Sequence, residues 1–291
     1  MNSINNIDLH VHSNISDGTL TPSELVQEAK NKGLRAFALT DHDTVNGIKE
    51  AKEAAHILKE TEGYELEVIS GVEISAGYGK RDIHILGFFI DENSTNLKQA
   101  LDNIKGDREV RNRQMVENLA NAGLPISMES LREEFPDAIL TRAHFAEFLQ
   151  KQGVVKEIKE AFTKYLSETG PYYVQRKYMA PETAISLIKE AGGIPVLAHP
   201  LLYHLSENQV KELISSLKEA GLMGLEAVHS TNINNDESYL RGLASAYGLI
   251  TSGGSDFHGT VKPTIQMGIG KGNLSIPYSV LENLKKLKEQ L

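Results

Sequence analysis

The 291-residue sequence contains no cysteine, no tryptophan and no apolar run long enough to cross a membrane. Without cysteine there are no disulfides and no thiolate nucleophiles, so a metal site has to use nitrogen and oxygen ligands. A spanning helix needs roughly 20 apolar residues, and the first residues lack the basic and apolar regions of a signal peptide. These absences predict a cytoplasmic protein with no membrane partner.

Positive charge is also scarce, because 30 Lys and Arg face 39 Asp and Glu, a formal net charge of −9. An acidic surface repels duplex DNA and anionic membranes. A phosphorylated substrate would therefore need a local positive site, either metal ions or a cluster of arginines. We expect no DNA duplex as a partner, and the sequence does not predict an oligomeric state.

Strand and helix patterns alternate before residue 91 and after residue 180. Thr21, Pro22 and Glu24 form a helix start with capping-box spacing, and Gly33 ends that helix. Alternating strands and helices imply a parallel sheet, and seven strands favour a closed or nearly closed α/β barrel. The expected strands are 7–12, 34–40, 66–75, 82–90, 194–199, 222–229 and 249–258, and the expected helices are 19–33, 46–60, 181–193, 206–221 and 236–247.

Residues 91–180 interrupt this alternation with polar, helix-like stretches and no convincing strand. They carry 13 basic against 14 acidic residues, whereas the remainder carries 17 against 25. We therefore expect a barrel of residues 1–90 and 181–291 with a helical insertion, 91–180. Because the insertion is nearly neutral on an acidic body, we expect it to help bind an anionic substrate.

Metal-competent side chains recur where the predicted strands end. In a strand, residues i and i+2 point to the same face, so His10 and His12 can converge on one ion. In a parallel α/β barrel the carboxyl ends of the strands share one mouth. The predicted metal centre therefore combines nine groups from six strand ends: His10, His12, Asp17, His42, Glu73, His84, His199, Asp256 and His258.

Each of these residues also has a structural explanation when taken alone. A lone histidine in a strand is usually a hydrogen-bonded structural residue, and Asp41 or Asp43 after a strand could be a helix N-cap. Burying many ionisable groups together, however, is costly unless something compensates them, which favours a metal centre. His56 and His204 lack this context, and the roles of His144 and His229 stay open.

The segments DLHVHSNISDG, LTDHDT, GVEIS, HILGF, VLAHP and GSDFH follow one another in this order. With them the chain resembles, over essentially its whole length, the PHP family (the polymerase and histidinol phosphatase superfamily) of metal-dependent phosphoesterases. The resemblance implies a distorted (β/α)7 barrel with up to three metals in its mouth.

The resemblance also implies how the ligands divide. His10, His12, Glu73 and Asp256 would hold a first metal, and Glu73 would bridge to a second that His84 and His199 also bind. A third metal would use Asp17, His42 and His258, although family members differ at the position of Asp17. Histidine-rich sites with carboxylates suit Mn, Fe or Zn better than Mg or Ca, so two to three such ions are the predicted cofactors.

The predicted reaction is hydrolysis of a phosphate monoester by metal-activated water. Two metals can lower the pKa of a water and neutralise phosphoryl oxygens, so no protein nucleophile is needed. Glu73 would be the bridging catalytic carboxylate, and Asp17 or His258 are candidates for protonating the leaving group. A histidinol-phosphate-type or other small-molecule phosphatase is an alternative. A non-catalytic metal- or phosphate-binding module is another, which the complete set of nine groups disfavours.

The substrate prediction depends on the insertion, where TRAHFAEFL places Arg142 and His144 at a helix start. This stretch resembles the PHP subgroup that dephosphorylates nucleoside 3′,5′-bisphosphates, some members of which also trim short RNA from the 5′ end. The predicted partners are therefore small phosphorylated nucleotides or short RNA. Further candidates for substrate binding are Arg111, Arg113 and Arg176, with Lys177 beside them. Alternatively, Arg142 is surface charge and His144 packs at the helix start.

Overall fold

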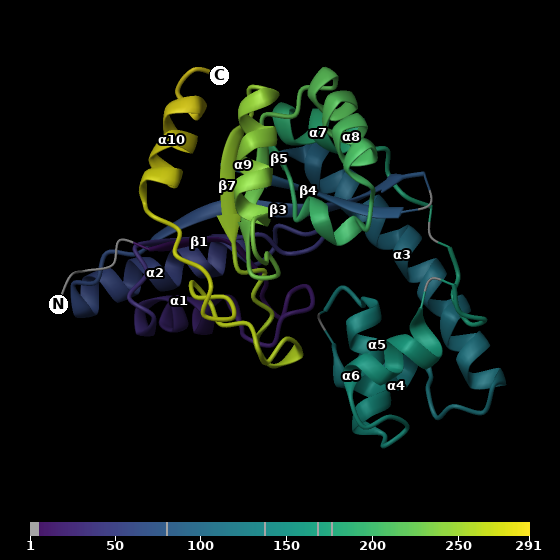
Figure 1. Cartoon of the computed structure of the whole chain (residues 1–291). Helices are drawn as coiled ribbons and strands as arrows, with labels where there is room; N and C mark the ends of the chain where they lie inside the picture. Colours follow the sequence, from purple (N-terminus) through teal and green to yellow (C-terminus); the bar gives the residue numbers. More distant parts are fainter. Residues whose placement is uncertain (1–5, 80, 137, 168, 176) are drawn as a thin grey trace.

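In the computed structural model of the protein, residues 6–79, 81–136, 138–167, 169–175 and 177–291 are described. Seven strands form one sheet in chain order (Figure 1). The sheet nearly closes, since the His12 N–H donates to the Phe257 carbonyl at 3.0 Å and the Asp256 N–H to the His10 carbonyl at 2.9 Å. The strands are β1 (Ile7–Val11), β2 (Ala36–Leu39), β3 (Glu67–Tyr78), β4 (Arg81–Phe88), β5 (Ile194–Leu197), β6 (Gly224–His229) and β7 (Ile250–Gly254).

The prediction of a parallel sheet is wrong at β4, which runs antiparallel to both β3 and β5. Only two residues separate Tyr78 from Arg81, too few for the crossover that parallel strands need, so β3 and β4 form a hairpin. This hairpin places His84 opposite Ser75, in the middle of a strand rather than at its carboxyl end. The other neighbouring strands pair in parallel.

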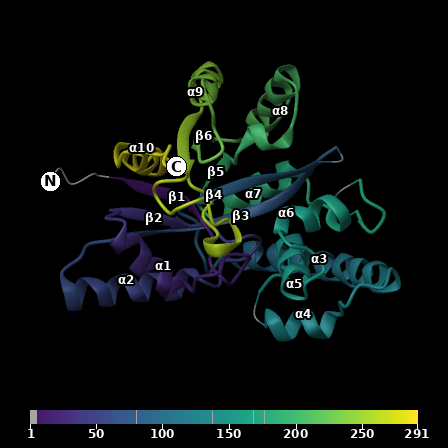
Figure 2. The same ribbon diagram turned by 60° about the horizontal axis from the view of Figure 1, so that its bottom comes forward.

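Helices cover the outside of the sheet, with α1 and α2 on one side and α8, α9 and α10 on another (Figure 2). The start of α1 is as predicted: Thr21 caps it, Glu24 completes the capping box and Pro22 is the first residue. Phe37 and Leu39 of β2 share an apolar cluster with residues of α1 and α2. The helices are α1 (Pro22–Asn31), α2 (Ile48–Glu62), α7 (Pro181–Glu190), α8 (Glu207–Glu219), α9 (Asp236–Ala246) and α10 (Ser279–Lys288).

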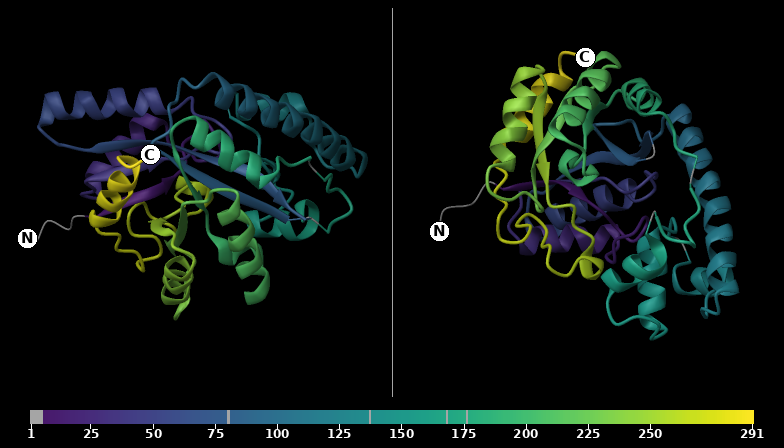
Figure 3. Two further views of the ribbon diagram at one scale, coloured as in Figure 1. Left: turned by 90° about the horizontal axis from the view of Figure 1, so that it is seen from above. Right: turned by 45° about the vertical axis from the view of Figure 1, so that its right-hand side comes forward.

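Between β4 and α7 the described residues form helices: α3 (Thr95–Asn121), α4 (Met128–Glu134), α5 (Arg142–Lys151), α6 (Ile158–Ala161) and the π-helical turn η1 (Phe162–Leu166). The first half of α3 contributes Leu97 and Leu101 to the barrel cluster. Its second half shares a separate apolar cluster with Phe145 and Leu149 of α5. The insertion thus has an apolar core of its own, and α3 extends from the barrel to it (Figure 3).

None of the described helices is long and apolar enough to cross a membrane.

Candidate metal centre

Glu73 lies at the centre of the predicted cluster and is fully buried. Burial alone would raise its pKa, but the surrounding histidines, His84 and His42 first, hold that pKa well below its usual range. Five imidazoles approach the carboxylate: on Oε2, His10 Nε2 at 3.3 Å, His12 Nε2 at 3.3 Å and His42 Nδ1 at 3.1 Å, and on Oε1, His84 Nδ1 and His199 Nε2, each at 2.9 Å.

Two aspartates face the same cluster from the segments that follow β1 and β7. Asp17 Oδ1 lies 3.1 Å from His258 Nε2 and 3.8 Å from His12 Nδ1. Asp256 Oδ1 lies 3.5 Å from His12 Nε2, and its Oδ2 accepts a hydrogen bond from Lys262 Nζ at 2.6 Å. All nine predicted groups therefore lie around one mouth.

The donor atoms fit divalent cations. Buried atoms without a hydrogen-bond partner point into the mouth, among them His10 Nε2, both ring nitrogens of His12, Asp17 Oδ1 and Glu73 Oε2. A buried polar atom left unpaired is costly, and a bound cation would satisfy several at once. Among the described residues, three groups have ligand atoms within 4.8 Å of one another: His12–Asp17–His42–His258, His10–His12–Glu73 and His42–Glu73–His84.

His42 belongs to two of these groups because its two ring nitrogens face different carboxylates. Nδ1 lies 3.1 Å from Glu73 Oε2, and Nε2 lies 3.8 Å from Asp17 Oδ2. His42 therefore lies between Glu73 and Asp17 and connects the two groups.

Sequence reasoning missed Glu226 of β6, which supports two of the histidines. Its Oε1 lies 2.9 Å from His10 Nδ1, and its Oε2 accepts the His199 N–H at 2.8 Å. A carboxylate behind a ligating imidazole fixes the orientation of its ring. The sequence feature that could have indicated its role is the position of this glutamate within the largely apolar strand segment GLEAVH.

His229, whose role the sequence left open, is buried at the end of β6. Its Nε2 lies 3.6 Å from Asp256 Oδ2 and has no hydrogen-bond partner. The Thr231 N–H donates to its Nδ1 at 3.3 Å. His229 therefore lies against a predicted ligand without joining the three groups described above.

Asp41 and Asp43 cap no helix, because α2 begins at Ile48 after Gly47, which makes no side-chain cap. Asp41 instead accepts hydrogen bonds from the Ser13 N–H at 2.7 Å and from Ser16 Oγ at 2.6 Å, which anchors the loop that carries Asp17.

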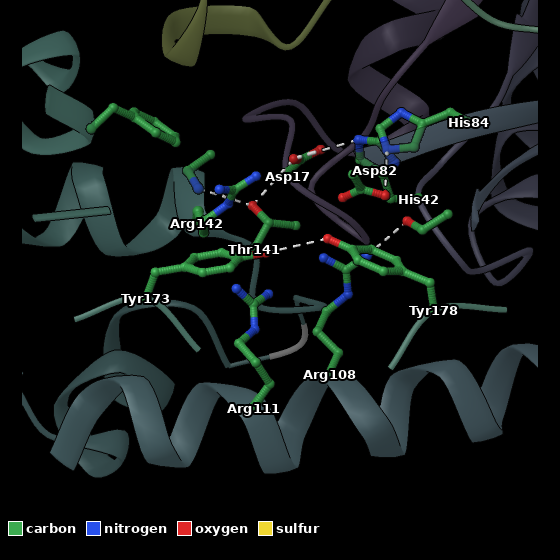
Figure 4. A pocket seen from close by; sticks show the side chains of 13 residues that line it. Asp17, His42, Asp82, His84, Arg108, Arg111, Thr141, Arg142, Tyr173 and Tyr178 are labelled. Atoms are coloured by element: carbon green, nitrogen blue, oxygen red, sulfur yellow. Dashed lines mark hydrogen bonds and ion pairs between the residues drawn. The ribbon is translucent and has the colours of Figure 1, made fainter. Parts of the chain in front are cut away.

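A cavity of about 160 Å³ lies beside the metal-competent groups (Figure 4). Arg108 and Arg111 project into it from α3, and Arg142 projects from the start of α5. Asp17, His42 and His84 line its other side, and Phe162, Tyr173 and Tyr178 add aromatic surface. The cavity thus brings guanidinium groups and metal-competent groups together.

Arg108 was not among the predicted residues, although it stands three residues before Arg111 and so on the same helix face. It is buried, pairs with Asp43 and donates to Ser75 Oγ at 3.0 Å. Its Nε has no hydrogen-bond partner, so the guanidinium retains a donor for an anion.

The remaining predicted substrate residues lie elsewhere. His144 packs at the start of α5, where its Nδ1 accepts the Thr141 N–H at 3.0 Å, and it lines a different cavity. Burial lowers the pKa of His144 to about 4. Arg113 is exposed and pairs with Glu109 at 3.3 Å, outside the arginine-lined cavity. Arg176 lies outside the described residues, and Lys177 is exposed.

The chain is similar in sequence, over most of its length, to proteins of two kinds. The chain is 38% identical over 86% of its length to a 5′-3′ exoribonuclease of Haemophilus influenzae, and the match covers 89% of that protein. It is 36% identical over 87% of its length to a 3′,5′-nucleoside bisphosphate phosphatase of Chromobacterium violaceum, again with 87% of that protein covered.

Solved structures agree with the fold. A protein of Bifidobacterium adolescentis described as a candidate metal-dependent phosphoesterase matches with a TM-score of 0.84 at 30% identity, covering 96% of this chain and 94% of that one. An amidohydrolase of Chromobacterium violaceum, solved with bound sulfate and no metal, matches with a TM-score of 0.84 at 33% identity, covering 97% and 96%. A model of the PHP domain matches residues 8–218. The chain therefore belongs to the PHP domain family.

Proposed function

We propose that this protein is a metal-dependent phosphoesterase that hydrolyses the 3′-phosphate of nucleoside 3′,5′-bisphosphates, giving a nucleoside 5′-monophosphate and phosphate. The observation that carries the proposal is the cavity in which Arg108, Arg111 and Arg142 face His42, His84 and Asp17. The Chromobacterium violaceum relative named 3′,5′-nucleoside bisphosphate phosphatase supports the substrate class.

The cofactors in this proposal are two to three Mn, Fe or Zn ions. A first would be held by His10, His12, Glu73 and Asp256, a second by Glu73, His84 and His199, and a third by Asp17, His42 and His258. When bound, such ions polarise phosphoryl oxygens and lower the pKa of a coordinated water. Elemental analysis of protein purified without chelator should find two to three equivalents. Absence of metal together with failure to rebind Mn, Fe or Zn would contradict this assignment.

The residues of the chain itself would bind and orient the substrate. An arginine-lined wall suits the 5′-phosphate, since a guanidinium binds a terminal phosphate through paired charge-assisted hydrogen bonds. The aromatic faces of Phe162 and Tyr173 lie beside it and suit the nucleoside. Asp17 and His258 are the candidates for giving a proton to the leaving 3′-oxygen. We therefore assign substrate binding to the insertion, residues 91–180, and the metal centre to the barrel.

The test measures phosphate release from adenosine 3′,5′-bisphosphate, both adenosine monophosphates and histidinol phosphate. The bisphosphate should be the best substrate, and adenosine 3′-monophosphate much poorer, because it lacks the phosphate whose binding energy serves catalysis. Arg142→Ala should reduce the preference for the bisphosphate over the 3′-monophosphate by roughly 10- to 100-fold, the effect of a hydrogen bond to a charged group.

The matched control is Arg113→Ala, since Arg113 is an arginine of the same insertion that lies outside the cavity. It should leave the preference unchanged. If histidinol phosphate were the best substrate, or if Arg142→Ala left the preference intact, the substrate assignment would fail.

Trimming of short RNA from its 5′ end is a second candidate activity, favoured by the relative named 5′-3′ exoribonuclease. The same wall of arginines would then hold the terminal 5′-phosphate. A 5′-phosphorylated ribo-oligonucleotide in the panel, compared with its 5′-hydroxyl form, tests this activity. Equal hydrolysis of the two forms would argue against it.

A further inference from the structure

A short segment of the insertion, residues 138–141, contacts the loop that carries Asp17. The Ile139 N–H donates to the Ile15 carbonyl at 3.4 Å. Asn112 of α3, which is buried, donates from Nδ2 to the Leu140 carbonyl at 2.8 Å. The segment is thus held on one side by the loop that leads to Asp17 and on the other by the long helix of the insertion.

Thr141 completes this contact with its side chain. Its Oγ donates a hydrogen bond to Asp17 Oδ2 at 3.2 Å, between two buried residues. The same Oγ caps α5 by accepting the Ala143 N–H at 3.2 Å. A hydroxyl has one proton to donate and two lone pairs to accept with, so both bonds can form at once (Figure 4).

The two carboxylate oxygens of Asp17 thereby differ in their hydrogen bonding. Oδ2 is bound by Thr141 of the insertion, whereas Oδ1 is buried without a hydrogen-bond partner and faces His258 Nε2 at 3.1 Å. A hydrogen bond to one oxygen restricts rotation of the carboxylate, so the other oxygen stays directed at the histidine cluster.

We propose that Thr141 is a positioning residue that holds Asp17 as a ligand of the third metal, so that docking of the insertion completes this site. The inference rests on the metal centre of the proposed function and goes beyond it, because it makes the insertion part of metal binding as well as of substrate binding. Arg142, which lines the substrate cavity, directly follows Thr141. Two consecutive residues would therefore act at the two sites, Thr141 on a metal ligand and Arg142 on the substrate.

The experiment titrates Mn²⁺ into metal-free protein and measures the free ion by electron paramagnetic resonance, with no substrate present. Thr141→Val keeps the shape of the side chain but removes its hydroxyl. It should weaken the last equivalent of Mn²⁺ by roughly 10- to 100-fold, as is typical when the partner of a metal ligand is lost. Thr141→Ser, which restores the hydroxyl, should bind as the wild type does.

The matched control is Ser127→Ala, which removes another hydroxyl N-cap of the insertion, at α4 and exposed to solvent. Its Mn²⁺ binding should equal that of the wild type. Far-UV circular dichroism checks that each variant is folded, and Thr141→Ala repeats the test if the valine variant is not.

Equal binding by wild type and Thr141→Val would overturn the inference and leave the proposed function intact. Equal weakening in Ser127→Ala would also overturn it, because loosening of the insertion would then suffice. A wild type that binds no Mn²⁺ would instead defeat the proposed metal centre itself.

Discussion

Among single residues, Glu73 has the most unusual surroundings, because one fully buried carboxylate is contacted by five imidazoles. A buried carboxylate keeps its charge only when positive partners or metals offset the loss of hydration. The surrounding histidines, His84 and His42 first, hold the pKa of Glu73 below its usual range, and they are also side chains that could bind ions beside it. In the proposed ligand assignment, Glu73 is therefore the carboxylate that would connect two metal sites.

Glu73→Gln should abolish turnover while the barrel stays folded. An amide has nearly the same shape but lacks the negative charge that two neighbouring cations require. We expect activity below about 1% of wild type, since removal of one group that acts in the transition state typically costs 10²-fold or more. Phosphate release and metal content by elemental analysis are the measurements, and near-native activity would show that the ligand assignment is wrong.

At the scale of secondary-structure elements, the β3–β4 hairpin and the segment before α7 both line the arginine-lined cavity. The Gly77 N–H of β3 donates to the Met179 carbonyl at 2.9 Å, and Ala76 forms a bridge with Met179. This pairing holds Tyr178 against the strand and in the cavity wall. Gly77 allows the close approach, because a Cβ at this position would lie 2.6 Å from Tyr178 Cβ.

Gly77→Ala should therefore push the segment that carries Tyr178 out of place and lower kcat/KM for the bisphosphate. A misplacement of about 1 Å can cost up to about 100-fold in rate. Steady-state kinetics measures this effect. Gly106→Ala in α3 is the control, since nothing lies within 4 Å of its added Cβ. It should keep full activity and gain about 0.5–1 kcal/mol in stability. Unchanged kinetics in Gly77→Ala would show that this contact does not shape the cavity.

At the scale of the whole molecule, the barrel and the insertion have separate apolar clusters that α3 connects. Polar contacts also join the two parts, and one of them lies at the predicted metal centre, where Thr141 donates a hydrogen bond to Asp17. A metal ion that is bound by the folded chain and not by the unfolded one would add to the stability of the folded state.

Removing metal should consequently lower the thermal midpoint as well as abolish activity. Ligand present at 100 times its Kd contributes about 2.7 kcal/mol, which corresponds to a shift of roughly 5 °C or more. Thermal unfolding with chelator, and again after adding Mn²⁺, measures the shift. Far-UV circular dichroism below the transition should stay unchanged, since the apolar clusters contain no metal-competent groups. An identical midpoint and full activity in chelator would contradict a metal-dependent enzyme.

Much about this protein follows from the sequence alone. Hydrophobic periodicity and the capping signals at Thr21 and Pro22 depend on neighbours within a few residues, and the seven strands and the start of α1 were predicted from them. The motif order predicted the PHP family and a phosphoric ester hydrolase, and the comparisons confirm both. His10 and His12 were recognisable as a pair because side chains two residues apart in a strand point to the same face.

Only the tertiary structure decided the direction of β4 and the partners that surround the site. Glu226 is 216 residues from His10, and Thr141 is 124 residues from Asp17. Arg108 enters the cavity only because α3 packs its first half on the barrel. Such contacts form only after whole helices and strands have packed together. Local sequence patterns do not indicate which distant residues that packing will bring into contact. Residue chemistry therefore indicated the kind of site, and packing determined which side chains complete it.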